Sequence, residues 1–510
     1  MIIAALLFAL GGLPADSDPS EIVCASQILG EIIGDDPVNY EDVIVVGNLD
    51  FEVLNLKDET KIIKSPISIT DSEFRGDVNF VNAIFQNDVN FEKAEFVGDV
   101  DFEEAEFFGD VNFRETNFSG GIANFRETKF LGDDVSFDNA KFLGGDALFE
   151  EVEFGSNPRF AKADFSGGGA YFSETTFRNG AYFHQATFSS GANFRDAKFL
   201  GGVVIFVKAK FLNGNFWDVK FLGGNANFKE AEFIGDALFV MSNFSGDANF
   251  EEAKFIGDAF FDVSNFSGDA NFVEAKFDKE AFFNNAHFNG TANFDRCWFK
   301  EDAFFENTAL KGSLSLNNTK YNKLFIRWDN IEGGLAYDDT AYLTLLKNFK
   351  DLGYFEDYDS CYFEYRKERR GQTRSQVGEG EEAFRKVIDF SLEWFYGYGT
   401  KPLNALFFSV GIIIGFGVFW RSIGLGRPEE ALDEYSLADA DHDSILEVLA
   451  FSATVFLSGT RLFIEPPPLP KIGGRSRSLI RGAFIFERVL GALFSILFFL
   501  AISGTVVRQL

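Results

Sequence analysis

Few residues of this 510-residue chain are of the types that carry out catalysis. His184 and His287 each stand beside a phenylalanine of a repeated pattern, and neither is accompanied by a Ser-His-Asp set or a cluster of metal ligands. Cys24, Cys297 and Cys361 form neither a disulfide framework nor a CxxC metal spacing. The sequence therefore predicts ordinary thiols and a protein without catalytic residues, metal or cofactor.

Three alternating aspartates could suggest a calcium-binding loop. Asp439, Asp441 and Asp443 have the right alternation, but Ser444 stands where such a loop turns on glycine. Ala450 stands where the loop needs its bidentate glutamate. Acidic residues before the first turn of a helix are stabilised by the helix dipole, which explains these aspartates better than calcium does.

The stretch 247–272 carries the pattern that organises about half of the chain. Its phenylalanines follow at steps of five and six residues, each with a small residue two positions earlier. The predicted core positions are Phe250, Phe255, Phe261, Phe266 and Phe272, with Ala248, Ala253 and Ala259 among the small residues. Such steps would scatter around a helix of about 3.6 residues per turn and fall on both faces of a strand. A solenoid of short sides, each turning one Phe and one small residue inward, accommodates them.

The units Ala-Asn-Phe-Glu-Glu and Ala-Lys-Phe-Ile-Gly resemble those of pentapeptide-repeat proteins. That resemblance implies a mainly β fold, a right-handed, four-sided parallel β-helix over residues 43–325. An extra residue, often glycine, enters every second side, so a coil would take about 22 residues. From Phe74 to Tyr321 this gives about 11 coils and a rod of about 50 Å. A three-sided coil remains an alternative.

The formal charge of −32 argues against direct nucleic-acid binding through a basic surface. Aspartates and glutamates on the sides of the rod could form ladders that bind cations, but a solvated face explains them more simply. Because solenoids commonly bind partners on their extended faces, we expect a binding surface for an unknown protein or surface ligand.

The N-terminal residues suggest export. Residues 1–15 include a short apolar run that suits a signal peptide, with a buried strand as the alternative. Residues 16–42 are predicted to form a helical cap, with the helix over Ser20–Ile33, because a β-helix exposes unpaired strand edges at its ends.

The C-terminal third is predicted to be helical and membrane-bound. Residues 326–400 form a helical juxtamembrane segment, broken at Gly353. Leu403–Trp420 and Val489–Val507 are apolar runs of 18 and 19 residues, each long enough to span a bilayer. Residues 401–510 should therefore form a two-helix transmembrane module. An apolar helix near 444–460 lies between them, and the prolines that follow it favour a re-entrant or interfacial position.

The order helix, short re-entrant helix, helix resembles the two-transmembrane pore module of potassium channels. The segment Glu487–Ala492 is similar to the start of the pore-lining helix in that family. This resemblance would place Thr454, Ser458 and Gly459 near a constriction, and it alone implies a homo-oligomer through the module. The segment lacks the glycines of the Thr-Val-Gly-Tyr-Gly filter, so a selective potassium pore is not expected.

Basic residues predict the orientation. Lysines and arginines close to the apolar runs are concentrated in the chain between them, which places that loop in the cytoplasm and both termini outside. Together with the signal peptide, this predicts a cell-membrane protein whose repeat rod lies on the extracytoplasmic side.

These features predict a non-enzymatic, membrane-anchored protein that acts as an envelope scaffold or binding surface. One alternative is an ion-channel-like or mechanosensitive pore with the repeat rod as its sensor. A second alternative is an acidic DNA mimic acting on a topoisomerase, which the resemblance to some soluble pentapeptide-repeat proteins implies. A membrane anchor and export argue against that second alternative.

Overall fold

The computed structural model describes residues 21–51, 61–372, 379–423, 425, 440–460, 464–469 and 476–503. These residues divide into two compact units, 1–341 and 342–510. The predicted signal peptide, residues 1–15, lies outside the described residues, as does Asp439.

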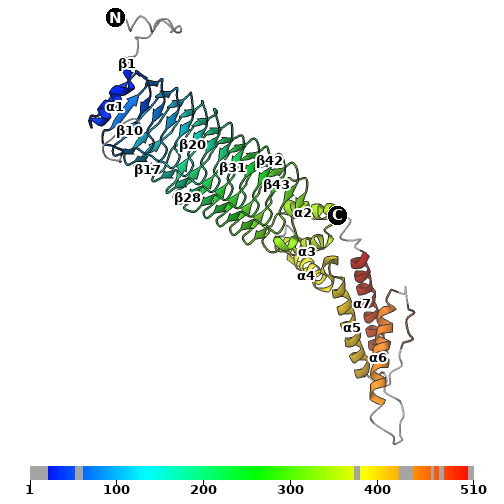
Figure 1. Cartoon of the computed structure of the whole chain (residues 1–510). Coiled ribbons are helices and arrows are strands. Elements are labelled where there is room, and N and C mark those ends of the chain that lie inside the picture. Colours follow the sequence, from blue (N-terminus) through cyan, green and yellow to red (C-terminus); the bar gives the residue numbers. More distant parts are fainter. Residues whose placement is uncertain are drawn as a thin grey trace, which may run out of the picture. The chain divides into compact units, whose positions relative to one another are not determined.

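The first unit is a parallel β-solenoid of about 13 coils (Figure 1). One sheet has 13 strands from β1 (Glu21–Cys24) to β46 (Trp298–Phe299), another 13 from β4 (Leu49–Asp50) to β50 (Leu324–Phe325), and a third 12 from β5 (Ile62–Ile63) to β48 (Ala309–Leu310). The remaining face carries two sheets, of five strands from β2 (Val38–Glu41) to β18 (Val135–Ser136) and of seven from β25 (Ala181–Tyr182) to β49 (Leu314–Ser315).

The strand register settles the number of sides. After β38 (Lys254–Phe255) the chain forms β39 (Ala259–Phe260), β40 (Asn265–Phe266) and β41 (Ala270–Asn271) in three other sheets. The next strand, β42 (Lys276–Phe277), pairs with β38, and Phe277 lies opposite Phe255. Four sides make one coil of about 22 residues, so the three-sided alternative is excluded.

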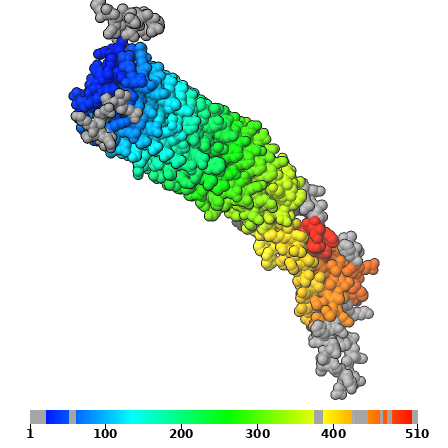
Figure 2. All heavy atoms as spheres, viewed as in Figure 1, coloured from blue at the N-terminus to red at the C-terminus, as the bar shows by residue number. Residues whose placement is uncertain are grey.

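Phenylalanine columns fill the interior of the solenoid. Phe250 lies 4.9 Å from Phe272 with ring planes 3° apart, and Phe255 lies 4.6 Å from Phe277 with planes 2° apart. Phe261 meets Phe250 edge-on at 86°. Each ring thus stacks on its equivalent one coil away and contacts a ring from another side at the preferred perpendicular angle. The colours in Figure 2 advance in narrow bands along this unit, as expected when each coil packs mainly on its neighbours.

Corners within a five-residue step pass through the left-handed region. Ala253 N–H donates to Phe250 O at 3.1 Å, and Glu252 between them has φ 57°. This geometry fits a type II turn, whose third residue needs a positive φ. The next such corner has Val263 with φ 60°, closed by the Ser264 N–H bond to Phe261 O at 3.3 Å. A β-branched residue is strained in this conformation.

Replacing Val263 by asparagine is expected to raise the free energy of unfolding by about 1 kcal/mol, because left-handed backbone costs about that much for residues with a Cβ and less for asparagine. Asn285 already occupies the same corner one coil later, with φ 56°. The reciprocal change Asn285→Val should lower stability by a similar amount. Thermal unfolding of both variants checks the prediction, and shifts of the same sign would contradict it.

Glycine occupies many of the six-residue corners, where adjacent coils approach closely. A Cβ on Gly257 would lie 2.4 Å from the carbonyl carbon of Gly235, one coil earlier. Because the clash is with backbone rather than with a movable side chain, a larger residue at Gly257 would force the two coils to shift; Lys279 occupies the equivalent corner one coil later. Where the extra residue of a six-residue step is glycine, it lets the corners of adjacent coils stack closely.

The N-terminal end differs from the prediction. Glu21–Cys24 form a strand, β1, that pairs with β3 (Val43–Val46), and the helix α1 spans only Ala25–Ile33. The pairing of all four residues with β3, with Val23 turned inside, means that the solenoid begins before residue 43. Ile28 and Ile32 of α1 are buried beneath the helix, which covers the end of the solenoid as a cap should.

The second unit is helical. It contains most of α2 (Asp339–Leu352), then α3 (Phe355–Gln372), α4 (Glu379–Tyr396), the 3-10 turn η3 (Gly397–Gly399), α5 (Pro402–Ile423), α6 (Ala440–Leu457) and α7 (Arg477–Ser503). Gly353, with φ 75°, separates α2 from α3, as the sequence predicts. The helix α7 begins well before the predicted apolar run Val489–Val507, because charged residues of its first half interrupt the apolar pattern without breaking the helix.

Candidate functional site

The predicted repeat residues form the interior of the solenoid. All eight are at most 1% exposed: Phe250, Phe255, Phe261, Phe266, Phe272, Ala248, Ala253 and Ala259. They are structural residues, so any binding function of this unit must reside in the outward side chains.

Aspartates at the six-residue corners bond to the next coil. Asp247 Oδ1 accepts the backbone N–H of Asp269 at 3.0 Å, and Asp269 Oδ1 in turn accepts Thr291 N–H at 2.7 Å. On another corner, Asp236 Oδ1 accepts Asp258 N–H at 3.2 Å. These carboxylates satisfy backbone donors that the turn leaves unpaired. Much of the acidic composition is thus part of the solenoid framework rather than a simple solvated face.

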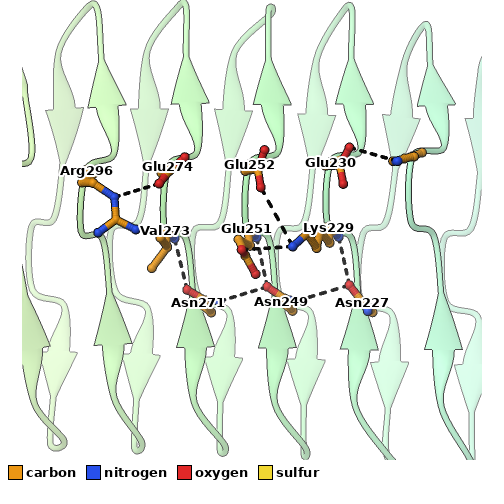
Figure 3. Close-up of polar contacts among 11 residues, drawn as sticks. Asn227, Lys229, Glu230, Asn249, Glu251, Glu252, Asn271, Val273, Glu274 and Arg296 are labelled. Carbon is orange, nitrogen blue, oxygen red and sulfur yellow. Dashed lines mark hydrogen bonds and ion pairs between the residues drawn. The ribbon is translucent and has the colours of Figure 1, made fainter.

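Asparagines form a second kind of ladder on the strands (Figure 3). Within one coil, Asn249 Oδ1 accepts Glu251 N–H at 3.0 Å. Between coils, Asn271 Nδ2 donates to Asn249 Oδ1 at 3.1 Å, and Asn249 Nδ2 donates to Asn227 Oδ1 at 3.4 Å. Each amide therefore uses its oxygen to hold its own turn and its nitrogen to hold the neighbouring coil.

Ion pairs cross the same surface. Lys229 Nζ lies 3.1 Å from Glu251, and Arg296 Nε lies 2.8 Å from Glu274 (Figure 3). These side chains are between a third and a half exposed, so each pair contributes at most about 1 kcal/mol. The surface ion pairs tune the outer charge but do not decide the fold.

Asp262 is the one outward carboxylate of the solenoid whose pKa is clearly shifted among the described residues. Burial raises the pKa of Asp262, although its Oδ1 accepts Asn284 N–H at 3.2 Å, which lowers it. A raised pKa means that ionisation costs the folded state free energy above that pKa, and the cost disappears as the pH falls below the unfolded value of about 3.9.

Asp262→Asn is therefore expected to raise the free energy of unfolding at neutral pH by less than about 1 kcal/mol, and with it the melting temperature. In acid, the stability of the variant should match that of the wild type. Asparagine can make the same bond, because Asn284, which occupies the equivalent position one coil later, accepts Glu306 N–H with its Oδ1 at 3.0 Å. The exposed Asp269→Asn keeps an equivalent acceptor and is the control, with no gain expected. Melting curves from neutral to acidic pH check this, and a gain that persists in acid would contradict it.

The histidines and cysteines considered as catalytic candidates lie apart from one another in the structure. His184 is half-buried, His287 is exposed, and Cys24 is exposed, whereas Cys297 and Cys361 are buried. Burial raises the pKa of both buried thiols, which keeps them protonated and weakly nucleophilic. The structure brings none of the five into contact with another, among the residues it describes.

Two helices of the described chain, Pro402–Ile423 and Arg477–Ile502, are long and apolar enough to span a membrane. Only 17% of each apolar stretch is buried within the chain. Phe407 and Val418 of α5 are 69% and 64% exposed, and Ile502 of α7 is 60% exposed. Core helices of soluble proteins are mostly buried, so this exposure favours a lipid environment over a packed core.

Small residues bring α6 and α7 together. A Cβ on Gly459, just after α6, would lie 2.2 Å from the carbonyl oxygen of Arg488, and one on Gly491 of α7 would lie 1.9 Å from that of Phe456. The helices α6 and α7 therefore touch backbone to backbone at these glycines. The helix α6 packs against both α5 and α7.

The pore-like residues lie at the end of α6. Thr454 Oγ1 donates to Ala450 O at 2.8 Å, and Ser458 Oγ donates to Val455 O at 2.8 Å. Residues 454–457 are α-helical, so their carbonyl groups point along the helix. Gly459 serves close packing against α7. This arrangement provides no row of outward carbonyls of the kind that a filter uses.

A buried carboxyl group joins the three helices. Glu487 of α7 is 0% exposed, and its Oε2 accepts the Nε1–H of Trp420 on α5 at 2.7 Å. Its Oε1 is hydrogen-bonded to Ser452 of α6, whose Oγ also donates to Ile413 O at 2.9 Å. An ionisable group buried among apolar helices is costly, which makes this cluster the strongest candidate site of the second unit.

A family model described as pentapeptide repeats (9 copies) matches residues 66–106, 102–146, 167–204, 228–276, 239–286 and 272–320. The solenoid is built from pentapeptide repeats. Neither the comparison with curated proteins nor that with solved structures gave a match.

Beyond the pentapeptide-repeat solenoid, a polar cluster ties α3 and α4 to the start of α5. Arg366 of α3 lies 2.9 Å from Asp389 of α4 and stacks over the Tyr398 ring at 4.7 Å. The Tyr398 hydroxyl donates to Asp389 at 2.8 Å. Burial, and then this hydrogen bond, raise the pKa of Tyr398. The cluster fixes the helical segment to the first apolar helix within this unit.

Sequence reasoning missed the aspartate corners and the Glu487 cluster. The corner aspartates could have been recognised in the sequence, because they recur one coil apart among the pentapeptide repeats. The sequence indicates the Glu487 site less clearly, through a single carboxylate in a largely apolar stretch of helix. Its partners Trp420 and Ser452 lie 67 and 35 residues away in sequence, and no local pattern connects them.

Proposed function

We propose that this protein is a non-enzymatic, membrane-anchored pentapeptide-repeat protein whose acidic solenoid acts as a scaffold or binding surface. The observation that carries this proposal is the exposure of large apolar side chains along α5 and α7. An apolar surface of that extent is rarely left in water and indicates a membrane or a partner. The solenoid, by contrast, presents regular polar rows that suit recognition by another molecule.

The proposal places the solenoid on the extracytoplasmic side of the cell membrane. Its support is the concentration of arginines and lysines in the chain between α5 and α7, because positively charged loops are retained in the cytoplasm. Neither catalysis nor a cofactor is part of the proposal, since the candidate nucleophiles are scattered and the buried thiols are protonated.

The test is protease added to intact cells and to lysed cells, after alkaline carbonate washing of the membrane fraction. Retention of the chain in washed membranes and digestion of the repeats in intact cells are expected. A chain released by carbonate would overturn the membrane anchor. Protection of the repeats until lysis would overturn the orientation, and inhibition of DNA supercoiling by a cytoplasmic rod would then favour the topoisomerase alternative.

A channel-like pore is the second candidate, because α6 packs between two helices that could span a membrane and all three meet at buried Glu487. In this case the solenoid would act as a sensor and the module as a homo-oligomer. Current recordings of purified protein in planar bilayers test it. Silence across monovalent and divalent ions, with the protein demonstrably inserted, would exclude conduction.

A further inference from the structure

An outward row of aromatic side chains runs along one face of the solenoid. We call it the aromatic stripe; it consists of Phe260 on β39, Phe282 on β43 (Ala281–Phe282), Phe304 on β47 (Ala303–Phe304) and Phe325 on β50. Successive rings stack at 4.9, 5.0 and 4.9 Å, with planes 4–6° apart. All four side chains are half-buried, so the ring edges remain accessible from outside.

The fold does not require aromatics at these positions. The interior of the same coils is already filled by the inward rings, such as Phe261 and Phe283, which are 0% exposed. On the opposite face, the equivalent outward row consists of Asn249, Asn271 and Asn293. Because polar side chains serve the same place elsewhere, four consecutive phenylalanines indicate a surface that is used for contact.

A column of carboxylates borders the stripe. Asp258, Glu280 and Asp302 each come two residues before a stripe phenylalanine, and alternate residues of a strand lie on the same face. The corner bonds hold the column in place: Asp258 Oδ1 accepts Glu280 N–H at 3.2 Å. Within the described parts of the chain, no lysine or arginine forms an ion pair with these three side chains. Lys323 takes the same place before Phe325, so the stripe combines an apolar centre with a negative border along its first three phenylalanines.

The spacing along the stripe favours a helical ligand. Coils repeat at about 4.8 Å, close to the 5.4 Å of a helical turn. Over the three intervals between four rings, a helix lying along the solenoid axis drifts by less than about 2 Å. An extended strand repeats its same-face side chains at about 6.7 Å and would drift by about 6 Å. A second copy of this chain would set two acidic borders together, which charge repulsion disfavours.

We propose that the aromatic stripe docks an amphipathic α-helix of a partner protein, with aliphatic residues on the phenylalanines and lysines or arginines against the carboxylate column. This proposal names the partner class for the binding surface proposed above and rests on it. This resembles the way in which other proteins bind an amphipathic helix, through apolar side chains that lie one helical turn apart. Membrane anchoring is not required for it, so the two proposals fail separately.

The experiment uses the full chain in nanodiscs of zwitterionic lipid and a fluorescent 18-residue peptide with leucines one helical turn apart, flanked by lysines. Anisotropy titrations, with empty nanodiscs as background, give the dissociation constant. The double variant Phe282→Ser, Phe304→Ser should weaken binding at least tenfold. The matched variant Asn271→Ser, Asn293→Ser, in the same coils on the opposite face, should leave binding unchanged. Circular dichroism and melting confirm that both variants remain folded.

A second variant separates charge from shape. Asp258→Asn with Asp302→Asn keeps the corner acceptors and removes two border charges, and it should weaken binding and reduce its salt dependence. A peptide of the same composition with scrambled leucines should bind at least tenfold more weakly. Equal binding of both peptides, or unchanged binding by the phenylalanine variant, would overturn the proposal. Phenylalanine-dependent self-association without peptide would identify a second copy as the occupant and would also overturn it.

Discussion

Phe261→Ala is expected to destabilise the solenoid by about 3–5 kcal/mol, the range found when a large aromatic side chain is removed from a core. Phe261 is 0% exposed and stacks on Phe239 and Phe283 at 4.9 Å on either side. It also meets Phe250 and Phe272 edge-on, at 86° and 89°. The cavity would thus interrupt one column and remove perpendicular partners from another, and each lost aromatic pair adds about 0.5–1.5 kcal/mol.

The adjacent residue provides the matched control. Phe260 is chemically identical but points outward, so Phe260→Ala should cost less than about 1 kcal/mol. Because each coil contacts mainly its neighbours, the loss at Phe261 should be local before it is global. Hydrogen exchange followed by mass spectrometry should show reduced protection in the coils that flank Phe261, with distant coils near Phe113 unaffected. Equal losses for the two variants would contradict the inward and outward assignment.

The sequence predicts the core of the solenoid because inward positions obey a rule that operates within a few residues. Phenylalanines at steps of five and six residues, each with a small residue two positions earlier, are accommodated together only if each one turns inward, and Phe250 and Phe266 are indeed fully buried. The number of sides could not be predicted in this way. It depends on which strand pairs with which, and that appears only in the register that sets Phe277 beside Phe255.

The ends and corners were harder to predict for a different physical reason. Glu21–Cys24 is a strand because β3 offers a partner, although its sequence continues smoothly into the helix α1. The carboxylate of Asp247 is structural because a backbone donor of the next coil, at Asp269, approaches it. Both features depend on a neighbour in space, whereas composition and spacing describe neighbours in sequence.

The helices α5 and α7 show the same difference between what sequence neighbours and spatial neighbours determine. Apolar length predicts α5 closely, with Leu403–Trp420 inside Pro402–Ile423. It predicts α7 less well, because the uninterrupted apolar run begins only after Glu487 and Arg488, whereas the helix begins before them. A charged residue inside a helix is tolerated when its partners come from other helices, and Trp420 supplies such a partner.

Replacing Glu487 by leucine is expected to destabilise the membrane module, whereas replacing it by glutamine should be nearly neutral. The reason lies in the number of hydrogen-bond donors available at Ser452. The Ser452 hydroxyl carries one hydrogen and contacts two acceptors, Ile413 O and Glu487 Oε1. Because a carbonyl cannot donate, both contacts can be full hydrogen bonds only if Glu487 carries a proton and donates it to Ser452. We therefore expect Glu487 to be a neutral carboxylic acid.

The surroundings agree with a neutral group. Among the described residues, no basic side chain forms an ion pair with Glu487, and the adjacent Arg488 instead lies over the Phe484 ring at 5.9 Å. An unpaired carboxylate would be costly between apolar helices, whereas the protonated acid satisfies all of its neighbours. Glutamine can copy that pattern, since its amide nitrogen donates to Ser452 and its oxygen accepts from Trp420.

Glu487→Leu leaves the Trp420 N–H buried without an acceptor, at a cost of about 1–3 kcal/mol, and removes the link to Ser452. Melting of the full chain in detergent should therefore show a clear loss for leucine and a change within about 1 kcal/mol for glutamine. Infrared difference spectra between wild type and Glu487→Gln should contain the carbonyl band of a protonated acid. Glu447→Gln, at an exposed residue of α6, is the control and should affect neither readout. A carboxylate band in place of the acid band, or equal losses for leucine and glutamine, would show that Glu487 is ionised and that its role depends on charge.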